Sequence, residues 1–113
     1  MKKVEAIIRT EKLEELKKVI GESEIVHGVT VSQVLGFGNQ QGFHEYLRGQ
    51  KIITTLLTKV KLEMVVEDNH VDQVIDLIIE KTRTGEVGDG KIFVWPIEEV
   101  VRIRTGESGR EAL

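Results

Sequence analysis

The sequence is poor in the residues that cross-link or rigidify small domains. It has no cysteine, a single proline (Pro96) and only 4% aromatic residues among 113 positions. The absence of cysteine excludes disulfides and thiolate metal sites, and it fits a reducing cytoplasm. No apolar run has the length of a signal peptide or of a membrane-spanning helix, so we expect neither.

The sequence also lacks an excess of positive charge. Its 16 Lys and Arg residues against 19 Asp and Glu residues leave a net charge of −3. A general nucleic-acid binder needs a basic surface, so we expect no direct binding of nucleic acid. Hydrophobic residues make up 40% of the chain, which supports a small core and one domain over residues 1–113.

Hydrophobic periodicity predicts four strands and two helices. Alternation indicates strands at 4–9, 29–36, 60–66 and 92–104, the last interrupted near Pro96. Helical spacing of apolar residues indicates helices at 13–20 and 71–79. We expect Thr10 and Asn69 to cap these helices, and Gly85 to end the second one. The polar tail at 105–113 is expected to be loose.

The order of these elements predicts an α+β fold. Strand, helix and strand occur twice, which is the ferredoxin-like βαββαβ arrangement with an antiparallel sheet and both helices on one face. The other face must meet water or a partner subunit. Because Ile7, Val65 and Phe93 or their neighbours are expected on that face, we predict an oligomer.

The segment between the two halves has no clear periodicity. Residues 37–57 carry Gly38, Gly42 and Gly49 among polar residues. An unassigned stretch of this length in a compact domain is usually functional or disordered. Its apolar end, 52–57, either extends the neighbouring strand or forms a surface that docks on a partner.

A glycine-rich segment between the second helix and the last strand is the most informative motif. Gly85, Gly88 and Gly90 are followed by Lys91 and an apolar run. Glycines let backbone N–H groups surround an anion, and a lysine adds a charge for a phosphate. A helix C-terminus followed by a tight turn explains the same residues, so both interpretations remain open at this point.

The spacing of Gly85, Gly90 and Lys91 matches the skeleton of a Walker A loop. Two features argue against that assignment. Ile92 stands where a Ser or Thr should hold magnesium, and a strand is predicted after the lysine where a helix is required. If the segment binds phosphate, it is a loop of another kind.

Motifs along the whole chain resemble the PII nitrogen-regulatory signalling proteins. The matching segments are Met1 to Arg9, Gly36-Phe37-Gly38 with Gln40, Tyr46 to Gly49, Lys59 to Glu63, Thr84 to Val94, and Arg102 to Glu107. The resemblance implies a homotrimer that senses ATP, ADP and 2-oxoglutarate and is not an enzyme. It implies a target-docking T-loop at about 37–56, a B-loop at about 83–91 and a C-terminal loop at about 102–113.

The resemblance also implies nucleotide binding in three clefts between subunits. The residues it assigns to the nucleotide are Thr30, Gly36, Phe37, Gly38, Asn39, Glu63, Val65, Gly88, Asp89, Gly90, Lys91, Arg102 and Arg104. The chemistry suits this role, because guanidinium groups offer forked donors to phosphate oxygens. The alternative interpretation of Arg102 and Arg104 is that they are two solvated arginines on one face of the last strand. The alternative interpretation of Lys61 and Glu63 is that they form an ion pair that contributes little to stability.

The resemblance assigns 2-oxoglutarate to Gln40 and Lys59. Lys59 would supply a cation for the dicarboxylate, and Gln40 would supply an amide oxygen to a Mg²⁺ ion shared with ATP. The implied partner is an ammonium transporter, or a regulator or enzyme of nitrogen metabolism, contacted through the T-loop with Arg48 as an anchor. The protein would then be cytoplasmic and recruited to the inner membrane face by a transporter.

Three positions depart from the family pattern. Asn39 stands where many members carry an arginine that reaches a phosphate, which puts the triphosphate and 2-oxoglutarate responses in question. Ile52 replaces the tyrosine that is modified in relatives, and Gln50 replaces a phosphorylated serine. We therefore expect regulation by ligands alone and do not transfer modification to Tyr46.

Two rival functions remain. The first is an adenine-nucleotide sensor with a lost or altered 2-oxoglutarate response, for which Asn39 is the hint. The second is a small nucleotide-using enzyme on the same fold, for which Asp89 is the nearest candidate base. His27, His44 and His70 lack the spacing of a metal site and are interpreted as surface residues.

Overall fold

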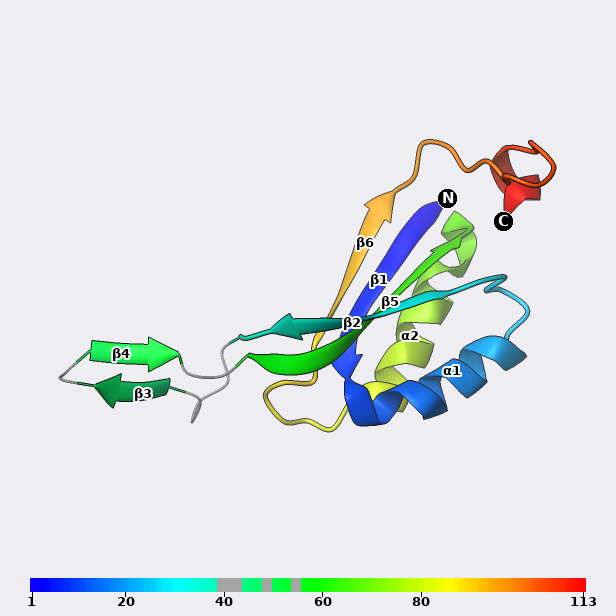
Figure 1. Cartoon of the computed structure of the whole chain (residues 1–113). Coiled ribbons are helices and arrows are strands. Elements are labelled where there is room, and N and C mark those ends of the chain that lie inside the picture. The colour runs from blue at the N-terminus through cyan, green and yellow to red at the C-terminus, as the bar shows by residue number, and fades with distance from the viewer. Residues whose placement is uncertain (39–43, 48–49, 54–55) are drawn as a thin grey trace.

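A four-stranded antiparallel sheet forms the centre of the computed structural model, which describes residues 1–38, 44–47, 50–53 and 56–113. The strands are β1 (Lys2–Arg9), β2 (Thr30–Gly36), β5 (Leu57–Val66) and β6 (Lys91–Pro96), in the order β2-β5-β1-β6. Helices α1 (Leu13–Glu22) and α2 (Val71–Thr82) lie together against the sheet (Figure 1). This arrangement confirms the predicted ferredoxin-like α+β fold.

The core lies between the two helices and one face of the sheet. Alternate residues of β1 and β5 point into it, and Leu16, Ile20, Val74 and Ile78 meet them from the helices. The strand residues are Val4, Ala6, Ile8, Val60, Leu62, Met64 and Val66. Their period of two, against the wider spacing on the helices, is the pattern from which the fold was predicted.

The opposite face of the sheet is open and mixed in character. Strand register places Ile7 beside Lys61, and Glu5 beside both Glu63 and Phe93. Phe93 is 41% exposed and Trp95 is 46% exposed. The predicted apolar residues therefore do lie on the face that the helices leave uncovered.

The predicted helix caps were wrong. A short 3₁₀ turn precedes each helix, η1 (Thr10–Lys12) before α1 and η2 (Asp68–His70) before α2. The N-cap positions of the α-helices are consequently Lys12 and His70, and neither makes a side-chain capping bond. Helix α2 also ends at Thr82 with Arg83 as its C-cap, before Gly85 is reached.

The segment that resisted assignment contains a short hairpin. Strands β3 (His44–Leu47) and β4 (Gln50–Ile53) pair antiparallel as a separate two-stranded sheet. In Figure 1 this hairpin lies beyond the ends of β2 and β5. Of the apolar end of the segment, Ile52 and Ile53 thus belong to β4, and Leu57 begins β5.

The last strand is shorter than predicted and the tail is more ordered. Strand β6 ends at Pro96, which lacks the N–H needed to continue a ladder. Residues 101–108 instead form a tight reversal closed by a bridge between Val101 and Ser108, followed by η3 (Gly109–Ala112). Arg102 and Arg104 therefore do not share a strand face.

Candidate functional site

The glycine-rich segment forms a loop whose backbone only glycine accommodates at its end. It connects α2 to β6 over residues 83–90, with φ of 89° at Gly85, 106° at Gly88 and 104° at Gly90. A Cβ atom on Gly90 would lie 1.7 Å from the carbonyl oxygen of Ile7. The loop therefore lies directly against β1, and the predicted strand after Lys91 is confirmed as β6.

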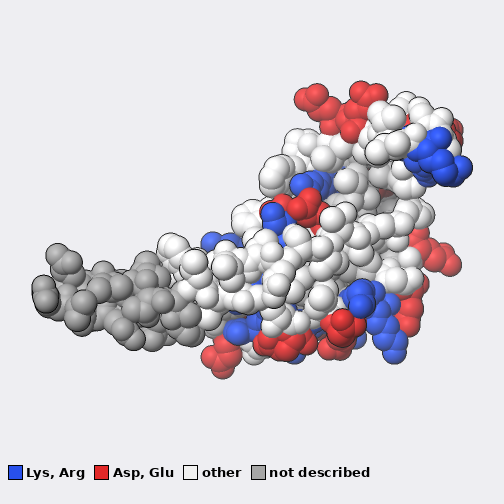
Figure 2. Space-filling view, viewed as in Figure 1, with Lys and Arg blue, Asp and Glu red and all other residues white. Residues whose placement is uncertain are grey.

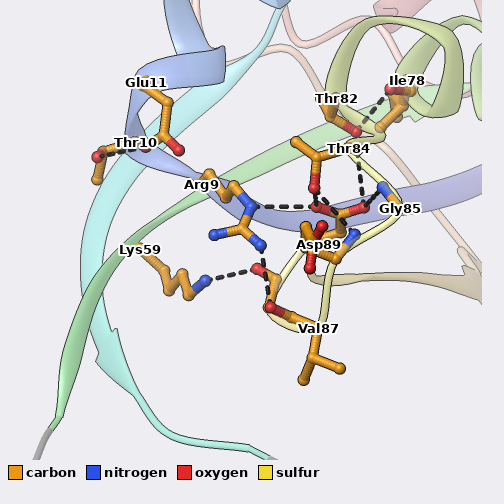
Figure 3. Close-up of polar contacts among 12 residues, drawn as sticks. Arg9, Thr10, Glu11, Lys59, Ile78, Thr82, Thr84, Gly85, Val87 and Asp89 are labelled. Carbon is orange, nitrogen blue, oxygen red and sulfur yellow. Dashed lines mark hydrogen bonds and ion pairs between the residues drawn. The ribbon is translucent and has the colours of Figure 1, made fainter. Parts of the chain in front are cut away.

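The carboxylate of Asp89 organises this loop from within. It accepts hydrogen bonds from the backbone N–H groups of Thr84 (2.8 Å) and Gly85 (2.9 Å). It also accepts hydrogen bonds from the hydroxyl group of Thr84 and from the Nε–H group of Arg9, the latter at 3.0 Å (Figure 3). The bonds from Thr84, from Gly85 and from Arg9 hold the pKa of Asp89 far below its usual range. Its carboxylate is directed into the loop, so its contribution to a nucleotide site would be indirect.

Two cations from the neighbouring strands hold the loop from outside. Arg9 donates through Nη2 to the carbonyl oxygen of Val87 at 3.0 Å. Lys59 donates through Nζ to the carbonyl oxygen of Gly88 at 2.6 Å (Figure 3). Burial is the larger cause of the lowered pKa of Lys59, because it disfavours the charged ammonium group. The positive charge of Arg9 lowers this pKa further by repulsion.

A cleft of about 490 Å³ lies beside the loop and is lined by six of the thirteen predicted nucleotide-binding residues and by Lys59. Gly36, Phe37 and Gly38 line it where β2 ends. Gly88, Gly90 and Lys91 line it from the loop, and Lys59 and Ile7 line it from β5 and β1. Backbone N–H groups, a lysine and apolar surface in one cleft suit a phosphorylated ligand with an aromatic base.

A second hollow, of about 310 Å³, holds a different part of the predicted set. Thr30, Glu63 and Val65 line it, with Lys3 beside them and the end of the tail, Ala112 and Leu113, along its edge. Lys3 forms an ion pair with Glu63 at 3.0 Å and lies over the Trp95 ring at 4.8 Å from its centroid. The hydrogen bond from Lys3 lowers the pKa of Glu63, which keeps this carboxylate charged.

The two arginines predicted for phosphate lie in the tail rather than in either cavity. The guanidinium of Arg102 donates to Glu107 at 3.1 Å and to the backbone oxygens of Glu111 and Leu113 at 3.0 and 3.2 Å. Arg104 is exposed in the turn that follows. Arg110 contacts Glu67, which fastens the tail to the end of β5.

Several predicted residues lie outside the described part of the chain. These are Asn39, Gln40 and Arg48, on which the magnesium, 2-oxoglutarate and docking predictions depend in part. Within residues 1–38, 44–47, 50–53 and 56–113 no cluster of three or more His, Asp or Glu residues could hold a metal ion. No helix in the same ranges is long and apolar enough to cross a membrane.

The charge distribution on the visible face is mixed. Figure 2 shows Lys and Arg side chains next to Asp and Glu side chains around the helices and the tail. Opposite charges at close range cancel the extended positive field that a nucleic-acid backbone requires.

One residue of the site was missed by the reasoning from sequence. Arg9 contacts the loop at two points, yet local patterning marks it only as the end of a strand. The available signal is its register: Arg9 lies directly opposite Lys59 on β5, a residue that was singled out. Predicting that pairing requires knowledge of which strands are neighbours.

The fold and the cleft together define a small ferredoxin-like α+β protein with a glycine loop held against an open sheet face. The family model "Nitrogen regulatory protein P-II" matches residues 1–107. The nitrogen regulatory protein P-II of Microchaete diplosiphon is 58% identical over 113 residues, with full coverage of both chains. The chain therefore belongs to the nitrogen regulatory protein P-II family.

The similarity extends across distant organisms. The P-II protein of Azospirillum brasilense is 50% identical, again with full coverage of both chains. "Nitrogen regulatory protein P-II 2" of Methanothermobacter thermautotrophicus is also 50% identical, over all of this chain and 97% of its own length. Because these relatives are named as regulatory proteins, a regulatory role is the one that family membership indicates.

Proposed function

We propose that the protein is a cytoplasmic P-II signalling trimer that binds ATP and ADP in clefts between subunits. The observation that supports this most directly is the division of nine of the thirteen predicted nucleotide residues into two groups. Six line the cleft beside the loop, and three line the hollow near Thr30 and Glu63.

The two groups lie at opposite ends of one sheet. The first includes Ile7 of β1, and the second includes Lys3 of the same strand. Four residues of strand correspond to about 13 Å. In the proposed trimer the loop end of one subunit would meet the tail end of the next, so that one nucleotide between them contacts both groups.

The chemistry of the joined site suits a nucleotide. Lys91 and the loop N–H groups would bind the phosphates from one side, and Arg102 and Arg104 of the neighbouring subunit would bind them from the other. Thr30, Glu63 and Val65 would contact the sugar and base. The open face that carries Phe93 and Trp95 would be buried by the assembly.

The same arrangement supports coupling to 2-oxoglutarate. Lys59 lines the cleft and lies near the end of the T-loop, at the start of β5. It would bind a carboxylate of the metabolite, with Gln40 completing a Mg²⁺ site shared with ATP. Ligands that contact the loop base differently would then shift the T-loop between conformations.

The output would be the docking of the T-loop on a target. Family membership favours an ammonium transporter, or a regulator or enzyme of nitrogen metabolism, with Arg48 as a contact. Binding to a transporter would bring the protein to the inner membrane face without a membrane span of its own.

Calorimetric titration of the full chain tests the proposal. ATP and ADP are titrated first, and 2-oxoglutarate with Mg²⁺ is then titrated in the presence and absence of ATP. Binding of 2-oxoglutarate only with ATP supports the coupled sensor. Nucleotide binding without it supports the adenine-nucleotide sensor, multiple turnover of ATP supports the enzyme, and no nucleotide binding refutes the proposal.

A further inference from the structure

Arg9 and Lys59 form an unusual pair on the sheet. They lie directly opposite each other across the β1–β5 ladder and carry like charges. Like charges in this position destabilise a strand pair. The pair is tolerated because both cations are engaged by acceptors of the B-loop.

The acceptors are three consecutive residues of that loop. Arg9 bonds the carbonyl oxygen of Val87 and the carboxylate of Asp89, each at 3.0 Å. Lys59 bonds the carbonyl oxygen of Gly88 at 2.6 Å. Arg9 therefore contacts the loop through two different nitrogen atoms of its planar guanidinium group. Two contacts restrain the orientation of the loop as well as its position.

Fixing these carbonyl groups also fixes the N–H groups that would bind phosphate. In a planar trans peptide the C=O of one residue and the N–H of the next point in opposite directions. Holding the Val87 carbonyl therefore sets the direction of the Gly88 N–H. Holding the Gly88 carbonyl sets that of the Asp89 N–H.

The rest of the loop is bound to the same network. Asp89 accepts the N–H groups of Thr84 and Gly85, so the start of the loop is tied to its end. The side chains of Arg9 and Asp89 are 22% and 24% exposed, so their ion pair is partly shielded from water. The start and the end of the loop are thus both bonded to Asp89, which Arg9 contacts in turn.

We infer that Arg9 is a positioning residue for the B-loop, which through Asp89 and the Val87 carbonyl holds the loop N–H groups ready for a nucleotide phosphate. The inference rests on the proposed function for its ligand. Arg9 acts here through the loop and not through contact with the phosphate.

The first experiment measures the loop without any ligand. Hydrogen–deuterium exchange of peptides covering Thr84–Lys91 is compared between the wild type, Arg9→Gln and the control Lys18→Gln. Lys18 is exposed on α1 and its replacement changes the net charge equally. Exchange in the loop is expected to accelerate about tenfold in Arg9→Gln only. This factor corresponds to the loss of roughly one charge-assisted hydrogen bond.

The second experiment separates positioning from simple charge. Arg9→Gln removes a positive charge and Asp89→Asn removes a negative one, so charge alone predicts opposite effects on ATP affinity. Positioning predicts that both variants bind ATP about tenfold more weakly, with adenosine affinity unchanged because adenosine has no phosphate. Arg9→Lys should be intermediate, since one ammonium cannot replace two separate donors.

The outcomes are distinct. Unchanged loop exchange in Arg9→Gln overturns the inference, as does tighter ATP binding by Asp89→Asn or an equal loss for ATP and adenosine. If the wild type binds no nucleotide, the proposed function fails, whereas the exchange result still decides whether Arg9 orders the loop. If Arg9→Gln does not fold, Arg9→Lys provides the same comparison with the charge retained.

Discussion

Arg9 and Lys59 lie directly opposite each other on β1 and β5, and both donate hydrogen bonds to the B-loop. Two elements that are far apart in sequence are thereby linked to the loop between α2 and β6. Lys59 also lies at the end of the T-loop, where 2-oxoglutarate is proposed to bind. The two proposed ligand sites of one subunit thus share a cation.

The charge of Arg9 should be measurable at Lys59. Burial is the larger cause of the lowered pKa of Lys59, and Arg9 is the next. Arg9→Gln should therefore raise the pKa of Lys59 part of the way toward 10.5, the usual value. Titration of the Lys59 side-chain NMR signal measures this, with Lys18→Gln as the control. A pKa that stays the same in Arg9→Gln would show that the two side chains are not coupled.

The hydrogen bonds that Asp89 accepts, from Thr84 first and then from Gly85 and Arg9, should make stability depend on pH in the acid range. Asp89 has a pKa lowered from 3.8, so the folded state binds its proton less readily than the unfolded state. The stabilisation is present above the unfolded pKa and is lost as the pH falls below it. Asp89→Asn should lower the free energy of unfolding by about 1 to 2 kcal/mol at pH 7.

The difference in the free energy of unfolding between the wild type and Asp89→Asn should become steadily smaller below about pH 4. Urea unfolding at fixed protein concentration, at pH 7 and pH 3, measures it. Asp76→Asn is a suitable control, because Asp76 is exposed on α2 and lies outside the loop. If Asp89→Asn lost the same free energy of unfolding at both pH values, the ionised carboxylate would not be the cause of the stabilisation.

Gly90 should be less replaceable than Gly85, the first glycine of the loop. Alanine at Gly90 combines a φ of 104° with a Cβ atom 1.7 Å from the Ile7 carbonyl oxygen, so β1 and the loop would have to separate. At Gly85 the φ is 89° but nothing lies within 4 Å of a Cβ atom, so only backbone strain results. We expect a loss of at least about 3 kcal/mol for Gly90→Ala and about 1 kcal/mol for Gly85→Ala.

Denaturant unfolding of both alanine variants tests this expectation. The two positions share a loop and a positive φ, so their difference isolates the close approach to Ile7. Similar losses at Gly85 and Gly90 would mean that the loop moves away from β1 at little cost.

The sheet and its faces were predictable because a period of two determines them. Val4, Ala6 and Ile8 alternate with Glu5, Ile7 and Arg9, and burial follows that alternation. The helix caps were not predictable, because a 3₁₀ turn before each helix moves the start beyond Thr10 and Asn69. Local propensity does not distinguish a capped α-helix from one that a 3₁₀ turn leads into.

The site was predictable in its parts but not in its connections. The glycine loop and Lys91 follow from residue type and spacing, and the family resemblance adds Gly36, Phe37, Gly38 and Lys59 among the residues that line the cleft. The inward direction of Asp89 and the engagement of Arg102 by the tail depend on contacts between distant segments. No local pattern reports these contacts, because they arise only when the sheet has assembled.

The tail should compete with a nucleotide for Arg102. Its guanidinium is bonded to Glu107 and to two backbone oxygens of the tail. Glu107→Gln should tighten ATP binding about two- to fivefold, because it weakens an exposed ion pair that phosphate must replace. Glu22→Gln on α1 is the control of equal charge, and calorimetry is the measurement. Unchanged or weaker binding by Glu107→Gln would mean that the tail does not restrain Arg102.

The open sheet face should hold the subunits together. Phe93 and Trp95 are 41% and 46% exposed on the face opposite the helices, where exposure of large apolar groups to water is unfavourable. The wild type is expected to sediment at three times the 12.8 kDa chain mass. Phe93→Asp should reduce this to a single chain, because a carboxylate cannot be buried there without a partner. Lys18→Asp on the exposed side of α1 should leave the mass unchanged. If Phe93→Asp still sediments as a trimer, the subunits make contact through another surface. The proposed joining of the two halves of the nucleotide site across this face would then be wrong.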